Sequence, residues 1–345
     1  MFRLKFPAAP TPGTDYLVNQ VGIRAIKEIR LVSQGQVVRR QSDDTMYVGA
    51  EATFGEERLA AWRELVGDAS RVARVQAAAS EATYYCVVDM IGEQEDKSRA
   101  ALLDSAAQLR PLRIEVVFHT PSYWSSNAAW TTPSVELMVD EIHAGAATLA
   151  SQRSQIFNQG DFPILAPRLI PLTRQTVAAG TENITIDLEE IQDRARLALW
   201  MVVMVRNKAD VDSGTYDNLL EVQSFNLESG GVQMTESVDR RQALWQRYLY
   251  SGTSAASGGS EASNPNLVFL DGCSPHSQAK DLGGTVFDGS ALALSELTQP
   301  KIQLKQSAGQ SAADRYVDCV VMASQVLDFR GGRFGGFRIT PRYSV

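Results

Sequence analysis

Histidine and cysteine are scarce in this chain of 345 residues, which has three of each. No pair among His119, His143 and His276 has the spacing by which one helix or strand holds a metal ion. An odd number of widely separated cysteines also argues against a disulfide framework. Cys86 and Cys319 fall within apolar runs, so we expect buried thiols in a protein assembled in a reducing compartment. The sequence therefore predicts no metal and no cofactor.

Motifs for nucleophilic catalysis and nucleotide binding are also missing. The sequence contains neither Gly-x-Ser-x-Gly nor Gly-x-x-x-x-Gly-Lys-Ser/Thr. Cys273 and His276 are close in sequence, but no third group that would orient them follows. Adjacent carboxylates such as Asp43-Asp44 and Glu56-Glu57 are expected on solvated turns or at helix N-termini, where the helix dipole favours them. We therefore expect no enzymatic activity.

The chain has neither an excess of positive charge nor a long apolar run. Its net charge is −7, whereas a nucleic-acid-binding protein usually carries a basic excess, so we expect no direct sequence-specific nucleic-acid binding. Arg330–Arg338 resembles an Arg/Gly tract, but a single unit directly after a strand favours a hairpin. The longest apolar run, Leu197–Val205, is nine residues, far short of the about 20 that span a membrane. It suits a strand that is buried on both faces.

The sequence does contain a weak internal repeat. In both halves, two alternating strands around a glycine precede a helix with a central tryptophan, and two further apolar segments follow. The matched pairs are Ile26–Gln41 with Leu219–Met234, Glu56–Val66 with Arg240–Leu249, Cys86–Met90 with Leu267–Asp271, and Leu109–Val117 with Leu297–Lys305. Offsets that drift between pairs are expected where loops differ in length. The repeat predicts two similar domains in tandem.

Short alternating runs separated by Ser, Thr, Gly and Pro predict an all-β protein. We expect two tandem eight-stranded antiparallel jelly rolls, with short inserted helices, at residues 1–165 and 166–345. Their junction is expected at Gln159–Pro171, where three prolines exclude a helix and confine any strand to a sheet edge. The predicted strands are 25–32, 36–41, 84–90, 112–119, 135–142 and 154–158, then 183–188, 196–206, 219–225, 232–235, 267–270, 301–306 and 317–329. At the N-terminus, Phe2, Leu4 and Phe6 alternate with cations, which predicts an edge strand or a contact with a membrane or another subunit.

One predicted loop, Thr120–Pro133, is rich in aromatic side chains. It carries Tyr123, Trp124 and Trp130. Loop tryptophans are typical of interface hot spots, so we expect contacts between subunits here, and a glycan-binding site of an adhesin or spike protein is the alternative. Arg342 and Tyr343, after the C-terminal strand, are further candidates for contacts with a neighbouring subunit.

Several of these segments resemble the major capsid proteins of the double jelly-roll lineage, which adenoviruses, tectiviruses and nucleocytoplasmic large DNA viruses share. The similar features are a strand pair followed by a Trp-containing helix, a Leu- and Pro-rich approach to an inner strand, and the opening of a second roll. They lie at Ile26–Gln41 and Glu56–Val66, at Tyr84–Met90 and Leu109–Phe118, and at Ile170–Val177, Ile184–Leu188 and Arg194–Val205. The chain is shorter than the larger members, so its outer loops must be small.

The resemblance implies a structural subunit of an icosahedral virion that is assembled inside the host cell. It implies a homotrimer, because three chains with two rolls each give six similar lobes that imitate a hexagon. The implied partners are neighbouring capsomers and minor capsid or penton proteins, with an internal membrane as a further candidate.

Overall fold

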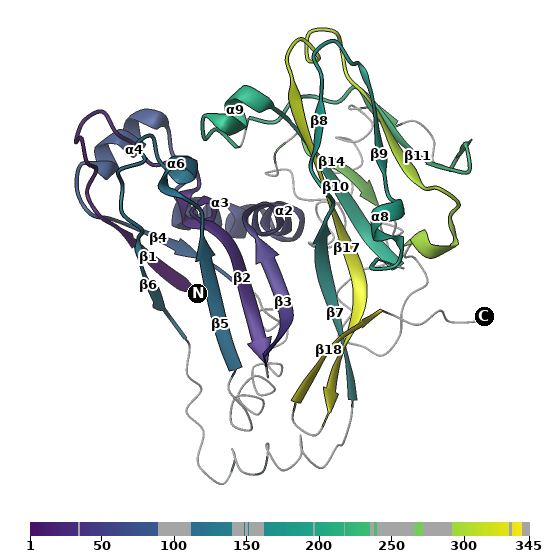
Figure 1. The fold of residues 1–345 in the computed structure, drawn as a ribbon, viewed down its shortest axis with the longest axis horizontal. Helices are drawn as coiled ribbons and strands as arrows, with labels where there is room; N and C mark the ends of the chain where they lie inside the picture. Colours follow the sequence, from purple (N-terminus) through teal and green to yellow (C-terminus); the bar gives the residue numbers. More distant parts are fainter. Residues whose placement is uncertain are drawn as a thin grey trace.

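The computed structural model describes most of both halves of the chain. The described residues are 1–33, 35–88, 112–139, 148, 151, 162–195, 197–216, 218–234, 238–239, 264, 266–271, 292–330 and 333–339. Antiparallel strands dominate them, and the helices are short (Figure 1). No helix within these residues is long and apolar enough to cross a membrane.

The first half combines two small sheets with helices at one end (Figure 1). Its elements are β1 (Phe2–Phe6), α1 (Val21–Arg24), β2 (Ile26–Ser33), β3 (Gln36–Ser42), α2 (Asp43–Thr53), α3 (Glu56–Val66), α4 (Arg71–Ala78), β4 (Ala82–Cys86), β5 (Leu112–Phe118), α6 (Pro121–Trp124) and β6 (Ser134–Leu137).

The second half is larger and richer in strands. Its elements are β7 (Phe162–Pro171), β8 (Gln175–Val177), β9 (Asn183–Asp187), α8 (Glu189–Gln192), β10 (Leu197–Asn207), α9 (Lys208–Asp212), β11 (Ser224–Ser229), β12 (Val232–Gln233), β13 (Val238–Asp239), β14 (Val268–Asp271), β15 (Leu292–Ala293), the 3₁₀ turn η3 (Leu294–Glu296), β16 (Lys301–Lys305), β17 (Arg315–Arg330) and β18 (Arg333–Ile339).

Strand pairing repeats between the halves, as the sequence predicted. In the first half, β1 pairs with β4 and β6, and β2 pairs with β3 and β5. In the second half, β10 pairs with β14 and β17, and β11 pairs with β12 and β16. Every pair is antiparallel, and the six strands correspond one to one in chain order. The two sheets of the first roll therefore have the same strand order as the corresponding strands of the second roll. The sheets of the second roll also contain further strands, namely β7, β8, β9, β13, β15 and β18.

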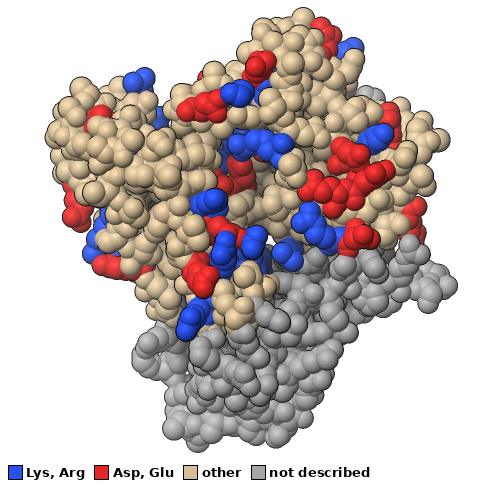
Figure 2. All heavy atoms as spheres, viewed as in Figure 1, with Lys and Arg blue, Asp and Glu red and all other residues tan. Residues whose placement is uncertain are grey.

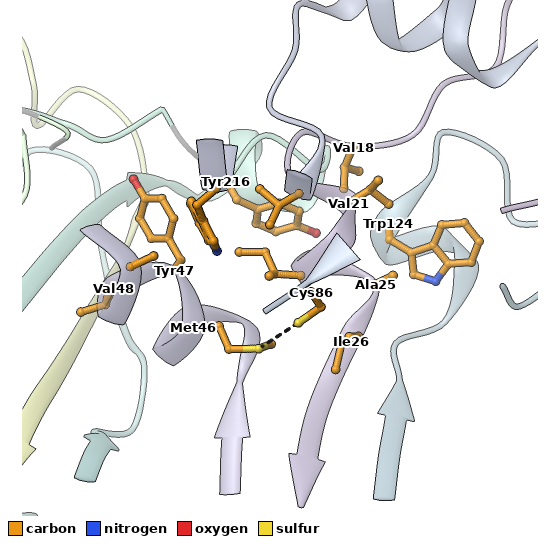
Figure 3. Packing of buried hydrophobic residues seen from close by; sticks show 14 of the residues in the cluster. Val18, Val21, Ala25, Ile26, Met46, Tyr47, Val48, Cys86, Trp124 and Tyr216 are labelled. Atoms are coloured by element: carbon orange, nitrogen blue, oxygen red, sulfur yellow. Dashed lines mark hydrogen bonds between the residues drawn. The ribbon is translucent and has the colours of Figure 1, made fainter. Parts of the chain in front are cut away.

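Each roll is a sandwich with an apolar core. In the first, Phe2, Leu4 and Phe6 of β1 pack in one buried cluster with Ile29 and Leu31 of β2. This alternation along β1 explains the phenylalanine and leucine pattern of the N-terminus. The same cluster includes Cys86 at the end of β4 and Met46 of helix α2. The Cys86 Sγ atom lies 3.5 Å from the Met46 Sδ atom (Figure 3).

Strand β10 is buried on both faces. Trp200, Val202 and Met204 belong to the same cluster as the first roll's core, whereas Met201 and Val203 pack in the core of the second roll. Side chains alternate across a strand, so a run that is apolar at every position serves two cores. The nine-residue apolar run predicted this strand correctly. Because one face of β10 packs in the same cluster as the first roll's core, the interface between the rolls is apolar.

Helix α3 begins and ends where the sequence predicts. Glu56 and Glu57 lie in its first turn, and Gly67 ends it with a φ of 85°, a conformation that suits glycine. The C-terminal hairpin is confirmed too, because β17 and β18 pair from Arg330 with Arg333 onward. The pairing shifts register between Leu327 and Phe329, which marks a bulge or irregularity in this long strand.

Some predictions from the sequence are wrong, and others concern residues that the structure does not describe. Strand β1 is the middle strand of its sheet and not an edge strand, because β4 and β6 flank it. Helices α2 and α4 were not expected. The strand predicted at 219–225 begins only at Ser224. The strand predicted at 154–158 and the helix predicted at 240–249 fall outside the described residues.

The proline-rich segment forms strand β7, which pairs along its whole length with β17. Among the described strands β17 is its one partner, as expected for a strand with three prolines. The predicted division of the chain between residues 165 and 166 falls inside β7, and it stays a prediction.

Candidate functional site

Charged side chains from both rolls meet in the buried region between them. We call them the inter-roll charge cluster. Its members are Arg24, Asp43 and Asp44 from the first roll, and Arg174, Arg206 and Asp318 from the second.

Local sequence places the two first-roll carboxylates. Ser42 caps helix α2, because its hydroxyl accepts from the backbone N–H of Thr45 while the Thr45 hydroxyl accepts from the backbone N–H of Ser42. Asp43 and Asp44 are therefore the first two helical residues, where the helix dipole stabilises negative charge. From this position Asp44 reaches arginines of the second roll, whereas Asp43 contacts Arg24 of its own roll.

Asp44 is the centre of the cluster. Arg24 Nη1 donates to its Oδ1 over 2.7 Å. The two terminal nitrogens of Arg206 donate to its two oxygens, each over 3.1 Å, and Arg174 Nη2 donates to Oδ2 over 3.1 Å. One carboxylate thus accepts four hydrogen bonds from three guanidinium groups, and two of these groups come from the other roll.

Asp318 completes the second-roll side. It accepts from Arg206 Nη2 and from Arg174 Nε, each over 2.6 Å. Arg206 and Asp318 lie on the faces of β10 and β17 that turn toward the first roll, in the same alternation that directs Val202 and Val320 there. Three cations and three carboxylates balance, which is the condition under which buried charge is tolerated.

Arg24, like Arg206, is fully buried. Its side chain has 0% exposure, and Nη1 also donates to Asp43 Oδ2 over 3.2 Å. The rings of Tyr216 and Tyr47 lie 4.8 and 5.3 Å from the guanidinium carbon. Nε and Nη2 have no hydrogen-bond acceptor among the described residues, so these aromatic faces compensate part of the lost hydration.

The charges shift each other's pKa values. Burial alone would raise the pKa of Asp44, but Arg206 and Arg24 hold it well below its ordinary value. Burial and the adjacent Asp44 raise the pKa of Asp43 to about 6, against the attraction of Arg24. Burial would lower the pKa of Arg206, but Asp44 and Asp318 keep it well above its ordinary value. Asp44 is therefore the firmly ionised anion, and Asp43 is the titratable one.

His119 and Tyr123 border the cluster. Their rings stack with centroids 3.8 Å apart, and the Tyr123 hydroxyl donates to Asp43 Oδ2 over 3.1 Å. Burial and the cations Lys27 and Arg24 lower the pKa of His119 to about 4. A histidine that stays neutral 3.8 Å from the Asp43 carboxylate adds no charge to the cluster.

The arrangement crosslinks the rolls. Every cation already contacts carboxylates of the cluster, and no group of three or more His, Cys, Asp or Glu side chains in the described part of the chain could hold a metal ion. Its geometry joins the two rolls by charge-assisted hydrogen bonds in a largely buried interface.

The structure brings one of the predicted loop residues to this site. Tyr123 is half-buried beside Asp43 and sits on the short helix α6. Its backbone carbonyl also accepts from the Tyr216 hydroxyl over 2.7 Å, which is a further link between the halves. Arg342 and Tyr343 lie outside the described residues, so their contacts stay a prediction.

The two tryptophans of this loop belong to the core instead. Trp124 is 0% exposed and donates to the backbone carbonyl of His119, and Trp130 is 3% exposed and donates to that of Pro7. Trp124 also packs edge-on against Phe6 (Figure 3 shows it inside the first roll). Rings buried in their own chain leave no surface for a partner or a glycan, so an exposed role for them is corrected by the structure.

The sequence did not predict the charge cluster, because its members are separated by up to most of the chain. Only Asp43 and Asp44 were predicted as a pair, on a solvated turn or at a helix N-terminus, and the helix N-terminus is where they lie. The available signals were Ser42 before two acids, which is a helix-start pattern, and Arg206 at the end of an apolar run.

Comparison with known proteins gives matches of structure alone. No protein-family model and no curated protein matches the sequence. A crystal structure of VP54 from PBCV-1, fitted into a reconstruction of the virophage Sputnik, matches with a TM-score of 0.67 at 12% identity, over 97% of this chain and 87% of that chain. A quasi-atomic model of the PBCV-1 capsid covers the same shares at 12% identity with a TM-score of 0.62. The Faustovirus major capsid protein matches with a TM-score of 0.60 at 8% identity, over 90% of this chain and 73% of that one.

These likenesses extend over both halves of the chain and agree with its repeated strand order. At sequence identities of 8–12%, these matches show the fold alone. The chain is an all-β protein with the double jelly-roll fold, as the sequence predicted.

Proposed function

We propose that this chain is a structural subunit of an icosahedral virus capsid and that three copies form a pseudo-hexagonal capsomer. One observation carries the proposal: the two rolls have the same strand order, and solved capsid proteins share their fold along nearly the whole chain. Two similar rolls in each of three chains supply six lobes, so a threefold assembly fills a position of hexagonal shape.

A building block of a shell must hold its lobes in fixed positions. Flexible domains joined by a small polar interface would move relative to each other. Here the interface contains the shared apolar core on one face of β10 and the inter-roll charge cluster. Glu51 of α2 adds a further link, because it accepts from Arg63 Nη2 and from the backbone N–H of Asn264. These contacts favour one rigid two-lobed unit.

The same role accounts for the chemistry of the interior. Each arginine of the cluster is paired with carboxylates of the cluster, as expected of a protein whose work is assembly rather than catalysis. Its partners in this proposal are its own copies, neighbouring capsomers and minor or penton proteins, with an internal membrane beneath as a further candidate. Its place is the virion, which is assembled inside the host cell.

Light scattering of the purified chain tests the proposal directly. We expect a mass of about three times 37.7 kDa that persists on dilution, because capsomer interfaces exceed the roughly 1,600 Å² of standard protein pairs. Images of the isolated particle are expected to show six lobes. A chain that stays monomeric at high concentration would contradict the proposed capsomer.

A further inference from the structure

The two rolls differ at one sheet edge. In the second roll, β16 lies between β11 and β9 and pairs with β9 along its whole length. The corresponding strand of the first roll, β5, pairs with β2 and has no partner on its other edge among the described strands (Figure 1). An edge strand offers a row of backbone N–H and C=O groups to another strand. The described part of the first roll therefore leaves open the edge that β9 covers in the second.

The side chains of β5 show the same open edge. Ile114 lies opposite Leu31 of β2. Ile302 lies opposite Leu227 of β11, so it holds the equivalent place in the second roll. Ile302 is 0% exposed, because Ile186 of β9 pairs with it, whereas Ile114 is 38% exposed. An apolar side chain on the core-facing side of β5 is thus partly uncovered where its counterpart is covered.

The sequence of β5 is complementary to itself. Residues 112–116 read Leu-Arg-Ile-Glu-Val, so apolar side chains alternate with the exposed Arg113 and Glu115. Two copies of β5 that pair in antiparallel fashion about Ile114 bring Arg113 of each strand opposite Glu115 of the other. The same register brings Leu112 of each strand opposite Val116 of the other. Opposite charges at directly opposed positions stabilise an antiparallel pair, and like charges destabilise it.

The charges next to this edge agree with pairing between two copies. Within the chain, Glu115 lies opposite Arg30, but Arg30 already donates to Glu28 over 2.7 Å. Arg113 lies opposite the uncharged Val32. Figure 2 shows cations and anions side by side over the part of the first roll that β2, β3 and β5 form. A surface of mixed charge can meet a second copy of itself, whereas a surface of one sign would repel it.

We propose that the free edge of β5 binds the same edge in a second copy of this chain, so that the β3–β2–β5 sheets of two copies form one continuous sheet. The contact has twofold symmetry. It is separate from the threefold contact of the proposed capsomer and does not rest on it. Five residues from each strand give a contact far smaller than a standard interface, so association through β5 should be weak and should grow with protein concentration.

Sedimentation velocity over a range of protein concentrations tests the proposal. We expect the species present at low concentration, whether monomer or trimer, to associate further as the concentration rises. Arg113→Glu makes both charged positions of β5 negative, and Glu115→Lys makes both positive. Each variant alone should associate about tenfold more weakly or less, because like charges then face each other. An equimolar mixture of the two should associate like the wild type, because opposite charges face each other again.

A matched control and a second measurement separate association from folding. Arg71→Glu reverses an exposed charge on α4 and should associate like the wild type. Thermal unfolding checks that each variant is folded. If Glu115→Lys fails to fold beside Arg30, Ile114→Cys in a Cys273→Ser chain replaces it. Facing Cα atoms of an antiparallel pair lie about 4.5–5.5 Å apart, which suits a disulfide, so mild oxidation should link two copies. Val72→Cys, 68% exposed on α4, should not be linked in this way.

Four results would overturn the proposal. One is the absence of any further association at high concentration, which would leave a threefold species and the proposed capsomer untouched. Another is equal weakening by Arg71→Glu and Arg113→Glu. The third is a mixture that associates no better than its two components. The fourth is slow hydrogen exchange, at the lowest concentration, of those β5 amides that do not bond to β2, which would mean that the same chain already covers this edge.

Discussion

Removing the charge of Asp44 should destabilise the interface between the rolls. The substitution Asp44→Asn keeps the size of the side chain but replaces one acceptor oxygen with an NH₂ group. Three cations, Arg24, Arg174 and Arg206, would then face two carboxylates, and the new NH₂ donors would face guanidinium donors.

The magnitude follows from burial. The Arg24 and Arg206 side chains have 0% exposure, so water cannot replace the lost carboxylate. Removing one partner of a buried pair typically costs about 3–5 kcal/mol. We therefore expect Asp44→Asn to lower the free energy of unfolding by about that amount, a large part of the stability of an ordinary domain.

Urea unfolding at a single protein concentration measures this change, since association shifts the midpoint. Asp212→Asn is the control. Asp212 pairs with Lys208 at 2.9 Å, but the two side chains are 51% and 40% exposed, so its loss should cost less than about 1 kcal/mol. A loss of less than about 1 kcal/mol for Asp44→Asn as well would refute the view that the cluster holds the rolls together.

Two further predictions concern pH and backbone. The pKa of Asp43 rises from an ordinary 3.8 to about 6, so the folded state favours its protonated form and this group's contribution to stability falls as pH rises from about 4 to about 6. Asp43→Asn removes this titration. In urea unfolding, the free energy of unfolding of the variant minus that of the wild type should increase by up to about 3 kcal/mol between pH 4 and pH 7. A difference that stays constant over this range would contradict the raised pKa. Gly67 has a φ of 85°, and an added Cβ would lie 2.6 Å from a ring carbon of Tyr84, whereas Gly180 has a φ of 83° with open space around it. Thermal unfolding should therefore show a larger loss for Gly67→Ala than for Gly180→Ala, and equal losses would show that the contact is unimportant.

The fold could be predicted to a large extent because its signals are local. Helix α3 has acids in its first turn and a glycine after its last, and β10 is apolar at nine successive positions. The repeat was visible because the equivalent strands keep their order along the chain. The position of a strand within its sheet has no local signal. The alternating pattern of β1 is the same whether one strand or two strands pair with it, so the sequence could not show that β1 is the middle strand.

The site could not be predicted, because its contacts join residues that are far apart in sequence. Asp44 and Arg206 meet only when the rolls dock, and the pattern around Asp43-Asp44 predicted a solvated turn or a helix N-terminus but no partner in the other half. The aromatic loop misled for a related reason. Trp124 lies among prolines and polar residues, yet a short helix turns its ring into the core, where it is fully buried.

The double-sided burial of β10 also bears on how the sequence can evolve. Adjacent residues of this strand face different neighbours: Val202 meets side chains of the first roll, and Val203 meets only its own roll. A change of volume at Val202 would call for a compensating substitution in the other half of the chain, whereas one at Val203 would call for a nearby change. Across related sequences, covariation along β10 should therefore alternate between distant and local partners with a period of two residues.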